Sequence, residues 1–175
     1  MTSAGFKLTS QDLVEGGVLP QPQVSAYFGL DGQDLSPQLS WSGAPEGTHS
    51  FAVTVMDPDA PRAGGFCHWA VVNIPSAVDE LPEGAGGAPD GMGPSDSEAG
   101  LPSGSLELVN DAGYNGFVGA APPRGSGPHR YVVTVHALSA DVIPGTPRTK
   151  GSRALRDIAA HELATASLTC TFEVR

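Results

Sequence analysis

The chain has little positive charge. Of its 175 residues only 9 are Lys or Arg, whereas 19 are Asp or Glu, which gives a formal net charge of −10. Residues 63–123 contain neither Lys nor Arg. Nucleic acids and anionic membrane surfaces are both recognised through clustered cations. We therefore expect neither nucleic acid nor an anionic membrane surface as a partner, and an anionic ligand would need a local site.

Long apolar stretches and cysteines are also scarce. No run approaches the roughly 20 apolar residues of a membrane-spanning helix, so we do not expect an integral membrane protein. Residues 1–11 lack the basic and hydrophobic pattern of a secretory signal, which favours the cytoplasm. Cys67 and Cys170 lie in apolar, strand-like contexts, and we expect buried free thiols rather than a disulfide.

Strand patterns dominate what is present. With 39% apolar and 16% charged residues, the composition is that of a globular chain, and we expect one domain over residues 1–175. Residues 50–57 and 168–174 alternate in polarity, and residues 68–74 and 130–138 are continuous apolar runs. Turn residues separate these segments, which predicts an antiparallel β-sandwich rather than repeated βαβ units.

Two other segments have a distinct pattern. Residues 152–166 predict a helix with Ser152 as its N-cap. Between Pro82 and Ser105, 15 of 24 residues are Gly, Pro or Ser, and eight acidic residues fall between Asp79 and Asp111. This composition predicts a flexible, exposed acidic loop at 82–105. The apolar face of the expected helix comprises Leu155, Ile158, Ala159, Leu163 and Ala166.

Two motifs combine rigid turns with histidines. Residues 56–61 are rich in Asp and Pro and precede Gly65–Trp69, while Gly119–Gly125 is rich in Pro and Gly and precedes His129–Tyr131. Each motif sets a stiff turn beside a histidine that flanks an apolar strand. This pattern indicates a small pre-formed polar pocket. It does not fit a nucleophile elbow, a phosphate-binding Walker loop or a zinc finger.

These motifs resemble a known family. Asp57–Pro61 with His68–Trp69 and Asn73–Pro75 resembles the first signature of the phosphatidylethanolamine-binding protein family. Gly119–Gly125 with His129–Tyr131 resembles its second signature. The short connection inside the first signature is similar to the bacterial, Raf kinase inhibitor-like branch.

The resemblance implies both a fold and a function. The fold would be the β-sandwich of this family, with a C-terminal helix and short peripheral helices. Members have a small pocket that accepts phosphate or a phospholipid headgroup, and some eukaryotic members regulate kinases or proteases. We therefore expect a protein that binds a small anionic ligand. A regulatory role, a protein partner and a homodimer are left open.

The resemblance also suggests how the pocket is built. It places His68 beside Asp57, whose carboxylate would orient the imidazole and favour the imidazolium form. It also implies a cis Ala60–Pro61 bond that aims Asp57 at His68. The residues themselves add two points: His129 and Tyr131 share side-chain parity along their strand, and the backbone amides of Ala120 and Ala121 could form an anion-binding concavity. The expected ligand-binding residues are Asp57, Asp59, His68, Ala120, Ala121, Pro122, His129 and Tyr131.

Two other functions use the same residues. As an enzyme, such as a lyase, cyclase or isomerase, the protein would use Asp57 and His68 as general acid and base, with His129 holding the substrate. Alternatively, Asp57, His68 and His129 are residue types that suit zinc. Because their spacing is not that of a compact metal motif, we expect no metal and no cofactor.

Overall fold

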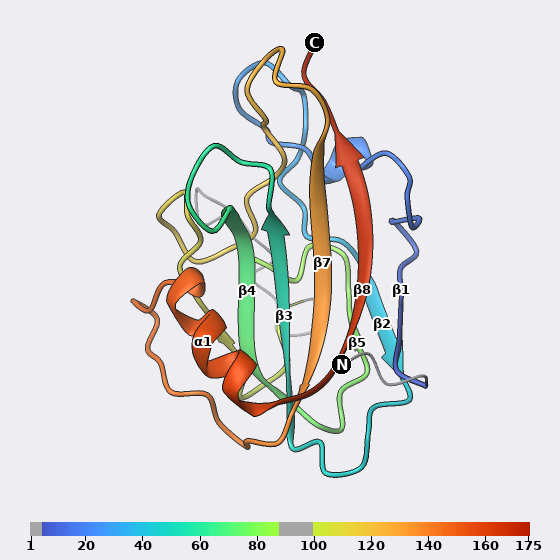
Figure 1. The fold of residues 1–175 in the computed structure, drawn as a ribbon, viewed down its shortest axis with the longest axis vertical. Helices are drawn as coiled ribbons and strands as arrows, with labels where there is room; N and C mark the ends of the chain where they lie inside the picture. The colour runs from blue at the N-terminus through green and yellow to red at the C-terminus, as the bar shows by residue number, and fades with distance from the viewer. Residues whose placement is uncertain (1–4, 88–99) are drawn as a thin grey trace.

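The computed structural model describes residues 5–87 and 100–175, which form two β-sheets and one α-helix (Figure 1). No helix within these ranges is long and apolar enough to cross a membrane. In chain order the elements are β1 (Lys7–Thr9), the 3-10 helix η1 (Gln21–Gln23), β2 (Leu39–Ser42), β3 (Ser50–Asp57), β4 (Phe66–Pro75), β5 (Glu80–Leu81), β6 (Leu106–Glu107), β7 (His129–Leu138), α1 (Gly151–His161) and β8 (Glu162–Phe172).

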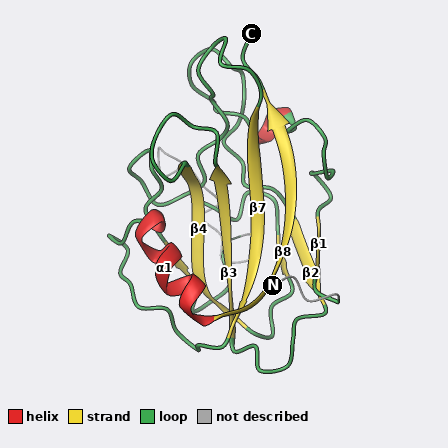
Figure 2. Cartoon of the chain, viewed as in Figure 1, coloured by secondary structure: helices red, strands yellow, loops and turns green. Residues whose placement is uncertain are grey.

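Both sheets are antiparallel, which confirms the predicted mainly-β class. The larger sheet has the order β6-β4-β3-β7-β8, and the smaller has the order β1-β2-β5. Figure 1 shows β4, β3, β7 and β8 side by side, and Figure 2 shows that long loops join the strands at both ends. All four strand segments predicted from the sequence pattern lie in this larger sheet.

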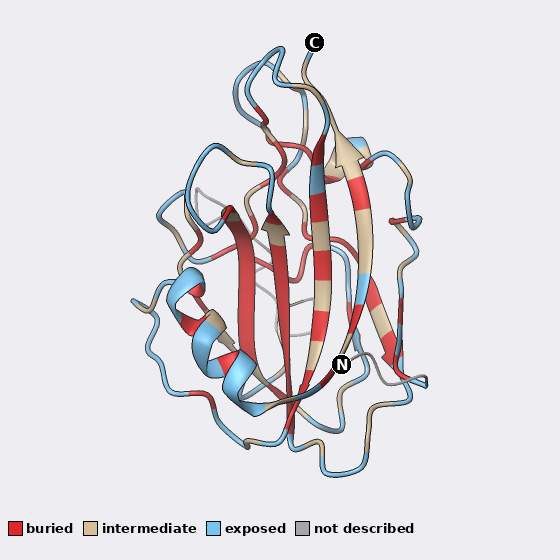
Figure 3. Cartoon of the chain, viewed as in Figure 1, coloured by how far each residue is buried: buried red, intermediate tan, exposed pale blue. Residues whose placement is uncertain are grey.

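The main core lies between the two sheets. Along β7 the buried residues alternate with partly exposed ones, as expected for a strand with one covered face (Figure 3). Strands β3 and β4 are buried over nearly their whole length because their second face is also covered. The side chains that fill this core include Trp41, Phe51, Val53, Trp69, Val71, Ile74, Leu81, Tyr131 and Val135.

A second, smaller core lies between β4 and α1. Ala154 and Ile158 of the helix pack with Ala70 and Val72 of β4. Gly151 begins the helix at a point where a Cβ atom would lie 2.7 Å from the Ala70 Cβ and 2.9 Å from the Cys67 Sγ. The absence of a side chain at Gly151 therefore lets α1 start directly against the strand.

The helix is shorter than the sequence pattern predicts. It begins at Gly151 with Lys150 as its N-cap, not Ser152, and it ends at His161 rather than Ala166. From Glu162 onward the chain is extended and pairs with β7 along its length. Pairing with a long neighbouring strand outweighs the local helical pattern, because β8 covers an otherwise open sheet edge.

The expected acidic loop is partly buried at its start. Within the predicted range 82–105, residues 88–99 lie outside the described residues. Gly84, Ala85 and Gly86 are buried, so the expectation of a uniformly exposed loop is wrong there. A Cβ at Gly86 would lie 2.9 Å from the indole nitrogen of Trp69, which explains the glycine. The prediction for the cysteines is confirmed, since Cys67 and Cys170 are buried free thiols.

The corrected helix boundary has a measurable consequence. Ile158 is almost completely buried, whereas Leu163, predicted on the same helix face, lies in β8 and is 38% exposed. We expect Ile158→Ala to lower the free energy of unfolding by about 2–5 kcal/mol through loss of packing. The matched Leu163→Ala change should cost less than half as much. Denaturant unfolding of both variants measures the difference, and equal costs would contradict the boundary.

Candidate functional site

A cavity of about 380 Å³ lies at the end of the large sheet where β3 ends and β4 and β7 begin. This is the upper end of these strands in Figure 1. The second motif and an arch formed by residues 24–34 complete its walls. Of the eight expected site residues, six line the cavity: Asp57, His68, Ala121, Pro122, His129 and Tyr131.

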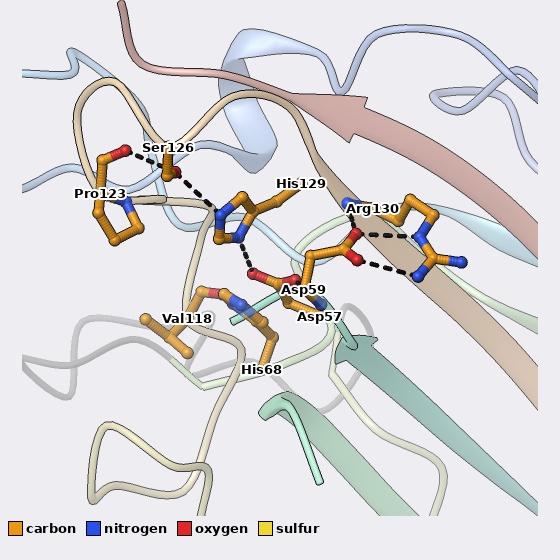
Figure 4. A network of polar contacts seen from close by, with 8 residues as sticks. All are labelled: Asp57, Asp59, His68, Val118, Pro123, Ser126, His129 and Arg130. Atoms are coloured by element: carbon orange, nitrogen blue, oxygen red, sulfur yellow. Dashed lines mark hydrogen bonds and ion pairs between the residues drawn. The ribbon is translucent and has the colours of Figure 1, made fainter. Parts of the chain in front are cut away.

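Asp57 and His129 form the most buried polar pair of the site. The His129 Nδ1 lies 2.7 Å from the Asp57 Oδ2, and both side chains are about 5% exposed or less. The His129 Nε2 lies 3.0 Å from the Ser126 hydroxyl, which donates to the Pro123 carbonyl (Figure 4). Both ring nitrogens of His129 are therefore engaged, one by a buried carboxylate and the other by a hydroxyl, which fixes the orientation of the imidazole.

His68 has a different partner. Its Nδ1 lies 2.7 Å from the Val118 carbonyl, which can only accept, so Nδ1 carries a proton. Nε2 has no hydrogen-bond partner among the residues described. Burial lowers the pKa of His68, and this effect outweighs the opposite effects of the Val118 carbonyl and of nearby carboxylates, including Asp57. The lowered pKa favours a neutral His68 imidazole that carries its proton on Nδ1 and has a lone pair on Nε2.

The expected pairing of Asp57 with His68 is therefore wrong. Strand β7 runs antiparallel beside β3, with Met56 opposite Val132, and this register brings His129 to the end of β3 where Asp57 lies. Val118 lies beside the start of β4 and makes two hydrogen bonds with His68. The Val118 amide donates to the His68 backbone carbonyl, and the His68 Nδ1 donates to the Val118 carbonyl. The sequence contained both histidines but gave no sign of which one meets the carboxylate.

Tyr131 supplies a polar group without a partner. Its side chain is 2% exposed, and its hydroxyl has no hydrogen-bond partner in the described part of the chain. The ring packs edge-on against the His68 ring at a centroid distance of 5.2 Å. Burial raises the pKa of Tyr131, so the hydroxyl stays protonated and can donate. A buried hydroxyl without a partner is costly and calls for an explanation.

The turn after Gly119 offers fewer free amides than expected. The amide of Ala120 donates to the Gln23 carbonyl, and Ala120 does not line the cavity. The amide of Gly119 donates to the Asp34 carboxylate at 2.7 Å. Among the amides of this turn, that of Ala121, a residue of the cavity wall, is without an acceptor within the described ranges. The expected pair of amides is thus reduced to one.

Asp34 is a site residue that sequence reasoning missed. It is buried, and its carboxylate accepts from Gly119 and, at 3.0 Å, from the Ala26 amide. The bond from Ala26 closes the 24–34 arch on itself, and the bond from Gly119 ties the arch to the second motif. Its backbone is in the left-handed region (φ 51°), which Asp tolerates better than most residues. Nothing in the local sequence distinguishes Asp34 from an ordinary loop carboxylate.

Asp59 lies outside the cavity wall. Its carboxylate accepts three bonds of 2.9 Å from Arg130, one from the backbone and two from the guanidinium (Figure 4). The hydrogen bonds from Arg130 lower the pKa of Asp59 to about 2. Because Arg130 follows His129, Asp59 fastens the first motif to the start of β7 rather than offering a contact to a ligand.

The turn after β3 is built without a cis bond. No peptide bond among the described residues is cis, so the expectation for Ala60–Pro61 is wrong. Gly64 and Gly65 complete the reversal in the left-handed region, with φ values of 80° and 77°. A Cβ at Gly65 would lie 2.5 Å from the Asp57 carbonyl oxygen. Two glycines thus provide the tight return for which a cis proline was expected.

The residues described contain no group of three or more His, Cys, Asp or Glu side chains that could hold a metal ion. Asp57 and His129 are hydrogen-bonded to each other, and the Nδ1 of His68 is hydrogen-bonded to the Val118 carbonyl. The arrangement therefore offers hydrogen-bond donors and one free imidazole nitrogen rather than a set of metal ligands.

Comparison with known proteins gives consistent matches. The model of the family described as phosphatidylethanolamine-binding protein matches residues 9–173. YbcL of Escherichia coli is 43% identical over 173 residues, which cover 99% of this chain and 90% of YbcL. YbhB of the same organism is 42% identical, covering 95% of this chain and 99% of YbhB.

Solved structures agree with these matches. The crystal structure of YbcL, described as a new member of the mammalian family, superposes with a TM-score of 0.89 at 44% identity. The match covers 98% of this chain and all of that one. The Chlamydia trachomatis homologue CT736 gives a TM-score of 0.75 at 28% identity, covering 99% and 100% of the two chains.

The contact between the arch and the second motif can be tested at Gly119. A Cβ there would lie 2.4 Å from the Val24 carbonyl carbon and 2.5 Å from the Ser25 nitrogen. We expect Gly119→Ala to lower the free energy of unfolding by roughly 1–3 kcal/mol. Gly5→Ala is the control, since nothing lies within 4 Å of its added Cβ. If denaturant unfolding finds the two variants equally stable, the arch does not pack as described.

Proposed function

Because the chain belongs to the phosphatidylethanolamine-binding protein family, we propose that its cavity binds a small phosphate-type anion. Membership in the family supports a ligand-binding protein. The ligand would be inorganic phosphate, a phosphomonoester or the headgroup of a phospholipid. These candidates share a compact tetrahedral anion with several acceptor oxygens.

The observation that carries this proposal is the buried, unpartnered hydroxyl of Tyr131, a residue that belongs to the cavity wall. A donor held out of water without an acceptor is stabilised by any ligand that brings one. The Ala121 amide offers a second donor in the same wall. Charge-assisted hydrogen bonds from such donors to anionic oxygens are among the stronger ones in proteins.

His68 would supply the third contact by changing its protonation. Its neutral Nε2 can accept from a protonated phosphate oxygen, or it can take up a proton and donate. A bound anion favours the imidazolium form and so opposes the lowering of the His68 pKa by burial. Binding of an anion that carries no proton of its own would therefore be coupled to proton uptake.

Asp57 and His129 would have a supporting role. Both nitrogens of His129 and one oxygen of Asp57 are already hydrogen-bonded within the protein. The carboxylate thus repels an anion less than a free Asp57 would, while the pair fixes the wall between Tyr131 and the second motif. Pro122 would contribute an apolar wall without a donor.

Acid–base catalysis is a second candidate, favoured by one observation. A neutral histidine with its Nδ1 held by Val118 and its Nε2 free has the tautomer and orientation of a general base. Asp57 would not orient it, in contrast to the pairing expected from sequence. Turnover of a phosphomonoester that stops in His68→Ala would favour this candidate, whereas binding without turnover would favour the first. Regulation of a kinase or protease stays a prediction of the family resemblance.

The coupling to protons predicts a pH dependence of binding. Sulfate is a suitable probe because it stays fully charged near neutral pH. Its affinity should be highest below the pKa of His68 in the empty site, which burial sets below 6.5. It should fall as pH rises, by up to tenfold per pH unit for one coupled proton. Isothermal titration calorimetry between mildly acidic and mildly basic pH measures this.

The variant His68→Ala should weaken sulfate binding at low pH by about 1.5–3 kcal/mol and remove the pH dependence. His49→Ala is the control, because His49 is exposed and pairs with Asp141 away from the cavity. A pH-independent affinity in the parent protein would refute the role given to His68.

Tyr131→Phe separates binding from stability. It removes a buried hydroxyl that has no partner, so the free energy of unfolding should stay equal or rise by about 1 kcal/mol. Anion affinity should fall by about 0.5–1.5 kcal/mol. Tyr114→Phe is the matched control, since its hydroxyl donates to the Phe117 carbonyl at 3.0 Å and its loss should destabilise the protein. Denaturant unfolding and calorimetry give both quantities, and unchanged affinity in Tyr131→Phe would count against the proposal.

A further inference from the structure

Phe28 is an unusual residue at the mouth of the cavity. Its side chain is 83% exposed although it belongs to the cavity wall. Its backbone lies in the left-handed region (φ 62°), which is unfavourable for a bulky side chain. A large aromatic group kept in water on a strained backbone gains nothing in the free protein. Both features are explained if something covers the ring when the protein is in use.

A second hollow of about 240 Å³ adjoins the cavity on this side. The two hollows share Phe28, Ala121, Pro122 and Pro123 in their walls. Leu30 adds another apolar side chain to the second one. The surface from the anion pocket to this hollow is therefore continuous across the Pro122–Pro123 segment. Val174 and Arg124 also lie in the wall of the second hollow, so that all but one of its lining residues are apolar.

We propose that this apolar hollow is a second subsite, which binds a ring-sized apolar substituent carried by the anion, with Phe28 as the specificity-determining residue. The inference rests on the proposed function, because the anion in the first pocket anchors the substituent. The ligand class is thus an anionic ester or acid with an aromatic or compact apolar group.

The size of the hollow decides between kinds of substituent. Its volume of about 240 Å³ is below the roughly 300–1,000 Å³ of pockets for drug-sized molecules. A single ring fits beside Phe28, where offset or edge-on packing between rings is favourable. Two acyl chains of a membrane phospholipid would extend far beyond it. The geometry therefore favours a small aryl group over a diacyl lipid as the occupant.

Phenyl phosphate and inorganic phosphate are the probes that test this. In the parent protein, calorimetry should find phenyl phosphate bound roughly tenfold more tightly, because the hollow removes apolar surface from water. In Phe28→Ala the preference should drop to about twofold or less. The readout is the ratio of the two affinities within one variant, so a change in the affinity for inorganic phosphate itself does not affect it. Tyr27→Ala is the matched control, since Tyr27 is the exposed neighbouring aromatic and lies in neither wall. It should keep the tenfold preference.

Each other outcome has a definite meaning. If inorganic phosphate binds but phenyl phosphate binds no better, or if Phe28→Ala keeps the preference, the second subsite is refuted and the anion pocket stands. If a short-chain phosphatidylethanolamine binds more tightly than phenyl phosphate and depends on Phe28, the substituent is a lipid chain and the ring-sized assignment is wrong. If neither phosphate binds, the proposed function fails and this inference with it.

Discussion

The hydrogen bond between Asp57 and His129 is the contact on which the rest of the site depends. It joins the end of β3 to the start of β7, two strands that are distant in sequence but paired over most of their length. Ser126 holds the other side of the imidazole. Because the pair is buried, removing either partner would leave a polar group uncompensated, which is far costlier than losing a surface contact. The two motifs are therefore fixed relative to each other before any ligand arrives.

Around this pair, several polar groups near the cavity are already hydrogen-bonded within the protein. Gly119 and Ala120 donate their amides to Asp34 and to Gln23. Among the described residues, the groups left without a partner include the Tyr131 hydroxyl, the Ala121 amide and one nitrogen of His68. A pre-formed site of this kind loses little conformational entropy on binding. Its rigidity comes from backbone carbonyls and buried carboxylates, not from the ligand contacts themselves.

Electrostatics sets the character of the pocket. The chain has a net charge of −10, and no Lys or Arg is among the described residues that line the cavity. Asp57 is hydrogen-bonded to His129, Asp59 is paired with Arg130, and burial lowers the pKa of His68. Under the proposed function an anion would meet local hydrogen-bond donors in this pocket, and the proton that His68 can gain would supply a positive charge.

The sequence alone determined the strands, the two motifs and the family, because each depends on local patterns. Alternation along residues 50–57, and the order of Pro, Gly and His in the motifs, constrain the backbone within a few residues. The partners of these residues were decided by the tertiary structure. The register of β3 and β7 places His129, rather than His68, beside Asp57. Pairing with β7 ends the helix at His161. The packing of the 24–34 arch places Asp34 against Gly119 and leaves Phe28 exposed. Contacts of this kind depend on how remote segments pack together, which no local pattern specifies.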